Sequence, residues 1–179
     1  MSSYDTIFDG MFDSFEFLAG FILIFLVVFL IALFIAVVSG LVTGYGLYCM
    51  AKRQNIANPW LAFLPFGQSH ILGALVGELE LFNSKIDTKL VLPISRAAVA
   101  VISSILSFAA PMLSFLFSIV SIAVMVFYFH VLYKLFMSRK PESAVLYTVL
   151  SILFNVIALP IIMIMIKDKD DITPDVIYE

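Results

Sequence analysis

Long runs without charge dominate the chain. Residues 17–51 contain no charged side chain, and a second apolar stretch, residues 90–133, is interrupted by Arg96 and Pro111. A third run covers residues 143–166. About 20 apolar residues cross the hydrocarbon core as a helix. The first and third runs therefore each predict one span, and the second, divided by a turn at Pro111, predicts two.

This pattern predicts an all-α polytopic membrane protein that forms a single membrane domain. Four transmembrane helices are expected at residues 17–44, 90–109, 112–133 and 143–166. Residues 1–16, as an acidic amphipathic segment, and the polar tail 167–179 are expected outside the membrane on its outer face.

The composition agrees with a chain that has lipid as its main solvent. Hydrophobic residues make up 63% and charged residues 13%, against about 45–50% and about 25% in soluble domains. The formal net charge of −3 gives no basis for nucleic-acid binding. The single cysteine, Cys49, excludes an intramolecular disulfide and a cysteine-built metal site.

The distribution of Lys and Arg sets the expected orientation. With the N-terminus outside, seven of them lie on the inner side: Lys52, Arg53, Lys85, Lys89, Lys134, Arg139 and Lys140. Lys167 and Lys169 lie outside. A fifth crossing by residues 60–77 would remove this bias, so residues 52–80 are expected to form an inner hairpin that is re-entrant or lies in the interface.

The hairpin has its own start and stop signals. Asn58 is expected to cap a helix that begins at Pro59, because Pro fits the first helical position. Trp60 is expected at the level of the lipid headgroups. Pro65, Phe66 and Gly67 are expected to end this helix.

A second short helix is expected to follow within the hairpin. Ser69 is its predicted cap, and the helix runs from His70 to Gly77. His70 is expected to have a structural role, with titration as the alternative. Broken backbone of this kind is tolerated at membrane depth only where protein or trapped water satisfies it.

The run GLYCMAKRQNIANPWLAFLPFGQSHILG resembles a pattern found in a family of small polytopic membrane proteins of Gram-positive bacteria. The shared motif is AKRxxIxNPWLA[FW]xP, and the resemblance covers residues 45–96. It implies a bacterial plasma membrane protein and carries over no catalytic residue. The family pattern is more basic where this chain has ELELFNSKIDTK.

A stripe of small residues lies along the first span. Ala32, Ala36, Gly40 and Gly44 recur at every fourth position. In lipid such stripes allow helix backbones to approach closely. Two readings stay open, namely packing within the chain's own bundle and a seam between copies of the chain.

Lys85, Lys89 and Arg96 share one face of the second span and its approach. Arg96 is expected to extend its side chain toward the interface. Together the three side chains are candidates for binding anionic lipid headgroups. A charge lining a cavity is the alternative for Arg96.

Other polar residues within the spans are expected to serve packing. Asn155 is the predicted interhelical hydrogen-bonding group of the fourth span, and Pro160, its predicted kink, releases the carbonyl of Val156. His130 is expected near the inner interface. The serines of spans two and three are expected to be small packing faces: Ser103, Ser107, Ser114, Ser118 and Ser121.

Catalytic motifs are missing from the sequence, and Arg96 is the one charged residue within the spans. We therefore expect no enzyme, cofactor or metal site. The expected function is that of a non-catalytic subunit or accessory protein that binds itself or another membrane protein, in contact with membrane lipids. The alternative is a small oligomeric pore or transporter with the inner hairpin as gate.

Overall fold

The computed structural model describes residues 3–81, 84–109 and 111–169, with side chains for residues 17–79, 85–107, 115 and 117–169. The chain divides into two compact units, Met1–Val38 and Ser39–Glu179, and each is described by itself. The side chains of the predicted acidic segment 1–16 and most of the predicted polar tail therefore lie outside the described part.

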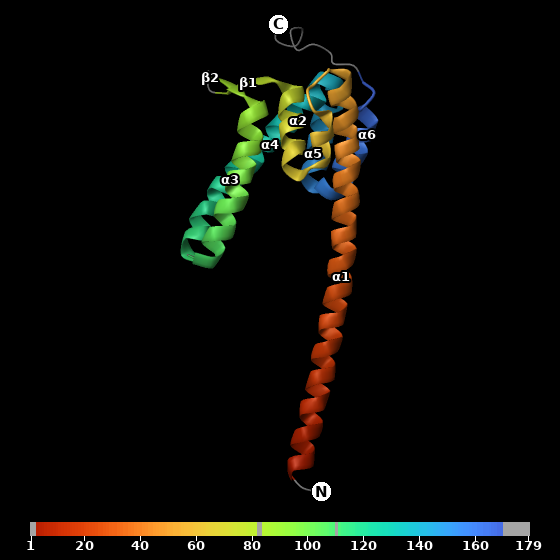
Figure 1. Ribbon diagram of the computed structural model, residues 1–179, viewed down its shortest axis with the longest axis vertical. Coiled ribbons are helices and arrows are strands. Elements are labelled where there is room, and N and C mark those ends of the chain that lie inside the picture. The colour runs from red at the N-terminus through yellow and green to blue at the C-terminus, as the bar shows by residue number, and fades with distance from the viewer. Residues whose placement is uncertain (1–2, 82–83, 110, 170–179) are drawn as a thin grey trace. The chain divides into compact units, whose positions relative to one another are not determined.

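The chain is mostly helical (Figure 1). The long helices are α1 (Ser3–Arg53), α3 (Thr88–Ala109) and α4 (Pro111–Arg139). Shorter helices are α2 (Pro65–Val76), α5 (Ala144–Leu153) and α6 (Asn155–Ile166). Two 3-10 helices, η1 (Pro59–Phe63) and η2 (Pro141–Ser143), and two strands, β1 (Glu78–Leu81) and β2 (Ser84–Asp87), complete the described elements.

Three helices are long and apolar enough to cross a membrane. They are Phe17–Arg53, Thr88–Ser107 and Phe117–Arg139, with 37, 20 and 23 residues. They correspond to the first three predicted spans, although α1 and α4 each continue beyond the predicted inner end. The chain therefore has the features of a multi-pass helical membrane protein.

The first unit is a stretch of α1 whose described side chains are all exposed. This holds for every residue from 17 to 38, including Ala32 and Ala36 of the predicted small-residue stripe. Large apolar side chains such as Phe17, Phe25 and Phe34 are 66–78% exposed. Within this unit the apolar surface has no described protein cover.

The fourth predicted span is not one helix. Helix α5 has 10 residues and α6 has 12, and they are separated at Phe154, whose φ of −128° and ψ of 48° leave the helical region. A membrane crossing needs about 20 helical residues, and each of these helices is shorter than that. An apolar run of 24 residues accommodates either one span or two half-length helices, and here it forms two.

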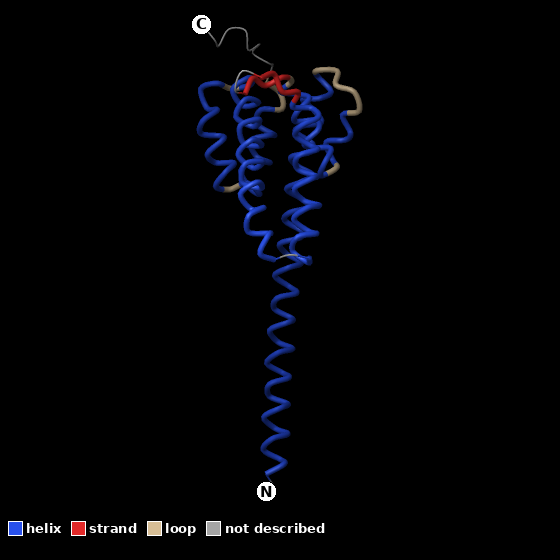
Figure 2. The backbone as a smooth tube through the Cα atoms, turned by 90° about the vertical axis from the view of Figure 1, so that its left-hand side faces the viewer, coloured by secondary structure: helices blue, strands red, loops and turns tan. Residues whose placement is uncertain are grey.

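The α5–α6 segment starts at the end of α4, and its last residues return to the same end of the second unit. Arg139, at the end of α4, donates through Nη1 to the carbonyl of Lys169, just beyond α6, at 2.5 Å. Arg53, at the end of α1, pairs with Asp168 at 2.9 Å. At the opposite end of α6, Val156 lies beside Ser39. Helix α6 therefore runs alongside residues 39–53 of α1 in the same direction. Figure 2 shows the helices of the second unit lying side by side, with the two strands across one end.

Helix α2 follows a similar course after the end of α1. Its first turn lies beside the middle of α1, because Gln68 Nε2 donates to the carbonyl of Gly40 at 2.8 Å. Just beyond its last turn, the carbonyl of Glu78 accepts a hydrogen bond from Lys134 Nζ of α4 at 2.6 Å. Two helical hairpins thus flank residues 39–53 of α1.

These pieces surround one buried cluster in the second unit. Helix α2 packs on α4, α4 on α5, and α5 on α6. Helix α1 closes the ring, since Gly44 lies against Ala62 of η1 and Gly46 lies against Met163 of α6. Helix α3 lies on α2 and α4. The largest fully buried side chains of the cluster are apolar: Phe136, Leu47, Met50, Ile71, Leu72, Leu79, Leu92, Leu132, Leu135, Met163, Ile166 and Val131.

A two-stranded antiparallel sheet departs from the all-α prediction. Glu78 pairs with Asp87 and Leu81 with Ser84, so β1 and β2 form a hairpin between α2 and α3. Leu79 is buried, while Glu78, Lys85 and Asp87 are exposed. Alternation of apolar and charged residues in Glu-Leu-Glu-Leu is the period expected of a strand, although the prediction assigned no element to residues 78–87.

The contacts of α1 predict opposite effects for two of its glycines. A Cβ added at Gly44 would lie 2.6 Å from the backbone oxygen of Ala62, whereas one added at Gly40 meets no atom within 4 Å. Gly44→Ala should therefore lower the free energy of unfolding by about 1–3 kcal/mol. Gly40→Ala should leave it unchanged or raise it by up to about 1 kcal/mol. Denaturant unfolding in detergent micelles, followed by Trp60 fluorescence, measures both. Equal stability of the two variants would contradict the close approach at Gly44.

Candidate functional site

The first hairpin begins without the predicted side-chain cap. Asn58 has φ 57° and ψ 54°, in the left-handed region, and its side chain makes no capping hydrogen bond. Its backbone carbonyl instead accepts from the N–H of Leu61 at 3.1 Å. Pro59 does occupy the first position of η1. Trp60 is 56% exposed, so more than half of its surface is not covered by the described protein.

The first helix of the hairpin ends just before Pro65, and the second begins at Pro65, five residues before the predicted start at His70. The 3-10 helix ends at Phe63, Leu64 is extended (φ −93°, ψ 139°), and α2 starts at Pro65. Pro disfavours helical geometry in the residue before it and fits the first helical position itself. A Cβ on Gly67 would lie 2.0 Å from the carbonyl oxygen of Leu61. Gly67 therefore allows the two arms of the hairpin to touch.

His70 satisfies a backbone carbonyl that a proline leaves without its usual partner. Pro93 lies inside α3 and has no N–H, so the carbonyl of Lys89, four residues earlier, lacks its helical donor. His70 Nδ1 lies 3.1 Å from that carbonyl oxygen. Because a carbonyl only accepts, Nδ1 must carry the proton and donate. This arrangement gives His70 a structural task.

Ser39 performs the same task for the second hairpin. Pro160 lies inside α6 and releases the carbonyl of Val156. The Ser39 hydroxyl of α1 donates to this carbonyl at 2.6 Å. Asn155 begins α6 and is exposed, and its side chain makes no hydrogen bond to a described residue. The predicted interhelical role of Asn155 is therefore not seen within this chain.

Arg96 connects three helices. Its Nη1 donates to Ser69 Oγ of α2 at 3.2 Å, and its guanidinium carbon lies 4.4 Å from the ring centroid of Tyr128 on α4. Ser69, predicted as a helix cap, lies inside α2 and is buried. Arg96 itself is exposed, as are Lys85 and Lys89. Of the three predicted headgroup ligands, Lys85 lies on β2, whereas Lys89 and Arg96 lie on α3.

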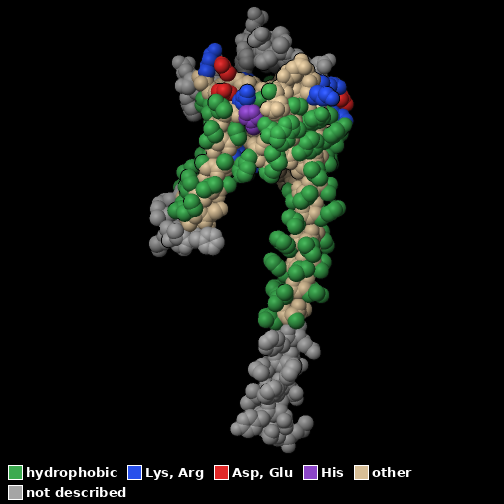
Figure 3. Space-filling model, in the orientation of Figure 1, with side chains coloured by type: hydrophobic (Ala, Val, Ile, Leu, Met, Phe, Trp, Pro, Cys, Tyr) green, Lys and Arg blue, Asp and Glu red, His purple; other side chains and the backbone are tan. Residues whose placement is uncertain are grey.

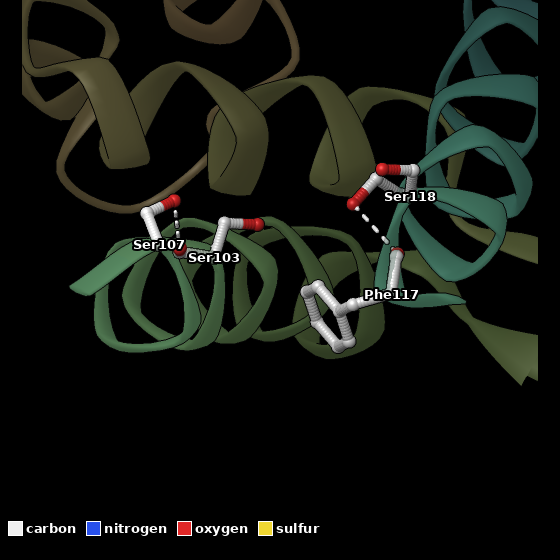
Figure 4. A pocket seen from close by; sticks show the side chains of 5 residues that line it. Ser103, Ser107, Phe117 and Ser118 are labelled. Carbon is white, nitrogen blue, oxygen red and sulfur yellow. Dashed lines mark hydrogen bonds between the residues drawn. The ribbon is translucent and has the colours of Figure 1, made fainter. Parts of the chain in front are cut away.

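Hydroxyl groups line a pocket between α3 and α4 (Figure 4). Its volume is about 230 Å³. Ser107 Oγ donates to the carbonyl of Ser103 at 2.8 Å, and Ser121 Oγ donates to that of Phe117 at 3.1 Å. These hydroxyl hydrogens are used on the helices, so the oxygens offer mainly acceptor capacity. The side chain of the fifth predicted serine, Ser114, lies outside the described part. The lining residues are Ser103, Ser107, Phe117, Ser118 and Ser121.

The break in the second hairpin is exposed. Phe154 is 57%, Val156 48% and Ile157 63% exposed. Leu64 and Phe66 of the first hairpin are also exposed, at 47% and 54%. Apolar side chains at both interruptions of the helical backbone are therefore exposed on the second unit, while the carbonyl of Val156 itself is bonded by Ser39.

Basic side chains gather at the opposite end of the second unit, beside the ends of α1, α4 and α6 (Figure 3). Besides the Arg53–Asp168 pair, Lys167 Nζ lies 5.0 Å from the ring of Tyr45, and Lys140 Nζ lies 5.7 Å from that of Tyr147. His130 is exposed, with its ring 6.5 Å from that of Tyr133.

The described residues contain no group of three or more His, Cys, Asp or Glu that could hold a metal ion. Positions that the sequence did not single out matter for packing. A Cβ on Gly46 would lie 2.8 Å from Met163 Cβ, and one on Gly73 would lie 2.2 Å from the carbonyl oxygen of Thr88. The Thr88 hydroxyl in turn bonds the carbonyl of Gly73 at 2.8 Å and lies close to that of Gly77. In the sequence, Pro93 and Pro160 were the signal that two carbonyls need donors from elsewhere, and this signal could have led to His70 and Ser39.

The pairing of His70 with the carbonyl freed by Pro93 predicts a dependence of one residue on the other. His70→Ala should lower the free energy of unfolding by about 1–3 kcal/mol, since it leaves this carbonyl without a donor. In a Pro93→Ala background the helix regains the missing N–H. There His70→Ala should lower the free energy of unfolding by a clearly smaller amount. Thermal unfolding of the four proteins in one detergent measures this coupling. A loss of equal size in both backgrounds would show that His70 acts in another way.

Comparison with protein-family models, with curated proteins and with solved structures found no match to this chain. The resemblance over residues 45–96 thus stays a prediction from the motif, and what the chain does has to be argued from the geometry of its hairpins, of Arg96 and of its basic end.

Proposed function

We propose that the chain is a non-catalytic integral membrane protein that works as a subunit of a membrane assembly. The observation that carries this proposal is the exposed helix break at Phe154–Val156. Lipid offers no hydrogen bonds, so irregular backbone at membrane depth is tolerated only where protein covers it or water reaches it. A second protein surface over this break would meet that requirement.

The proposed topology has three crossings, with α5 and α6 as a re-entrant hairpin. Because α6 ends beside Arg53 and Arg139, the side of the membrane that holds those residues also holds Lys167 and Lys169. All Lys and Arg except Arg96, which lies within α3, then fall on the inner side or its rim. The bias is stronger than with four crossings, and it supports an outer N-terminus and an inner C-terminus. The motif resemblance supports a bacterial plasma membrane.

The packing of the ring argues against a conducting path within one chain. Its centre holds Met50, Leu132 and Phe136, each 0% exposed, among other buried apolar residues. An ion path needs oxygens, charges or water along its length. A pore or transporter, the alternative function, would therefore have to form between copies of the chain, with the hairpins lining the path.

Topology can be tested with single cysteines in a Cys49→Ser background. Lys169→Cys should react with an impermeant maleimide only after cell lysis, as should Glu142→Cys between α4 and α5. Ser2→Cys should react in intact cells. If Lys169→Cys reacts in intact cells while Glu142→Cys does not, the segment between them crosses the membrane and the three-crossing proposal is wrong.

Assembly can be tested by placing a photo-crosslinking amino acid at the exposed break. At Ile157, 63% exposed, it should give adducts with a second polypeptide in native membranes. At Ile122, a similarly exposed position on α4 (60%), it should react mainly with lipid. Mass spectrometry of the adducts identifies the neighbour as another copy or a different protein. Lipid adducts alone at both positions would refute the proposed covering of the break.

A further inference from the structure

Arg96 has the geometry of a receptor for a negatively charged group. We propose that Arg96, held by Ser69 and Tyr128, binds the phosphate of an anionic phospholipid at the seam of α3 and α4. The contacts of Arg96 with α2 and α4 fix the plane of its guanidinium, and its exposure leaves N–H groups available on the surface of the second unit.

The positioning of the guanidinium is the first step of the argument. One N–H is used on Ser69 Oγ at 3.2 Å, and the face of the group lies 4.4 Å from the ring centroid of Tyr128. A guanidinium has five N–H donors in a fixed fork, which matches the oxygens of a phosphate. Arg96 also forms a side-chain hydrogen bond with Tyr128, and the other N–H groups of the fork remain for a ligand. A planar group held this way loses little freedom when it binds.

The charge of Arg96 is the second step. No carboxylate of a described residue pairs with it, and the aromatic ring of Tyr128 compensates only part of its charge. An ionised group within a membrane-spanning helix is costly unless a partner or the interface satisfies it. A negatively charged group from outside the described residues would supply such a partner.

The depth of Arg96 identifies the source of that charge. It lies eight residues beyond Thr88, the first residue of α3, which is about 12 Å along the helix axis. Helical side chains tilt toward the N-terminus, here toward the basic end, so the guanidinium reaches back to the zone of lipid phosphates. Lys89, one heptad earlier on the same face, is exposed and adds positive potential. Met125, three residues from Tyr128 on α4, is 52% exposed and offers apolar surface to an acyl chain.

The experiment uses the full chain in nanodiscs of phosphatidylcholine, with and without phosphatidylglycerol. Native mass spectrometry measures the phosphatidylglycerol retained per protein and its apparent affinity. Arg96→Gln should weaken this affinity about fivefold, the effect of one cation near a lipid surface. Ser103→Ala, one heptad deeper on the same face of α3, is the control and should retain lipid as the wild type does.

Two further arms keep the outcome decisive. If Arg96→Gln does not fold, Arg96→Lys and Ser69→Ala replace it, since the first keeps the charge without the fork and the second removes the positioning contact. Both should bind phosphatidylglycerol more weakly than the wild type. Inorganic phosphate at millimolar concentration should not displace the lipid. Displacement of the lipid by phosphate would show that the ligand is a soluble anion. Unchanged lipid retention in the Arg96 variants would contradict the proposal that Arg96 binds the phospholipid.

Discussion

Backbone carbonyls that lose their helical donors constrain the second unit of this protein. Pro93 and Pro160 each remove an N–H from an apolar helix, and lipid cannot replace it. The side chains that bond the two freed carbonyls, His70 and Ser39, come from neighbouring helices. Each of these hydrogen bonds therefore also holds two elements together. His70 joins the first hairpin to α3, and Ser39 joins the second hairpin to α1. The prolines that interrupt local bonding thereby specify which helices must be adjacent.

The two hairpins use the same building principle with different residues. Each follows a helix that ends in basic residues, starts with a 3-10 turn at a proline, and returns through a 12-residue helix. The first hairpin folds tightly, because Gly67 lets the arms touch and Gly44 lets α1 approach. The second is held to α1 through Gly46 and Ser39. The described ring is therefore filled mainly by apolar side chains, although the hydroxyl of Ser151 is buried without a hydrogen-bond partner among the described residues.

The sequence was sufficient for the features that depend on composition and local order. Charge-free runs located three helices able to cross a membrane, and Pro111 located the turn between two of them. It was insufficient where a choice depends on partners distant in the chain. An apolar run over 143–166 accommodates one span or two half-helices, and the contacts of Val156 and Asp168 with α1 decide between them. Likewise, α2 starts at Pro65 and not at the predicted His70, because this start depends on the hairpin arm that precedes it. No spacing rule pairs Ser69 with Arg96.

The hydrogen bond from Ser39 to Val156 joins residues 117 positions apart, which has a consequence for biosynthesis. At about 5–20 residues per second, translation separates the two by roughly 6–23 s. During this interval α1 is already in the membrane with its hydroxyl unused, and neither Met163 nor the ion pair of Asp168 is yet available to it. Helix α6, which is synthesised long after α1, therefore completes the packing of α1. A nascent chain truncated before α6 would expose Gly46 and Ser39 to the lipid and to any insertion chaperone that recognises unpaired polar groups.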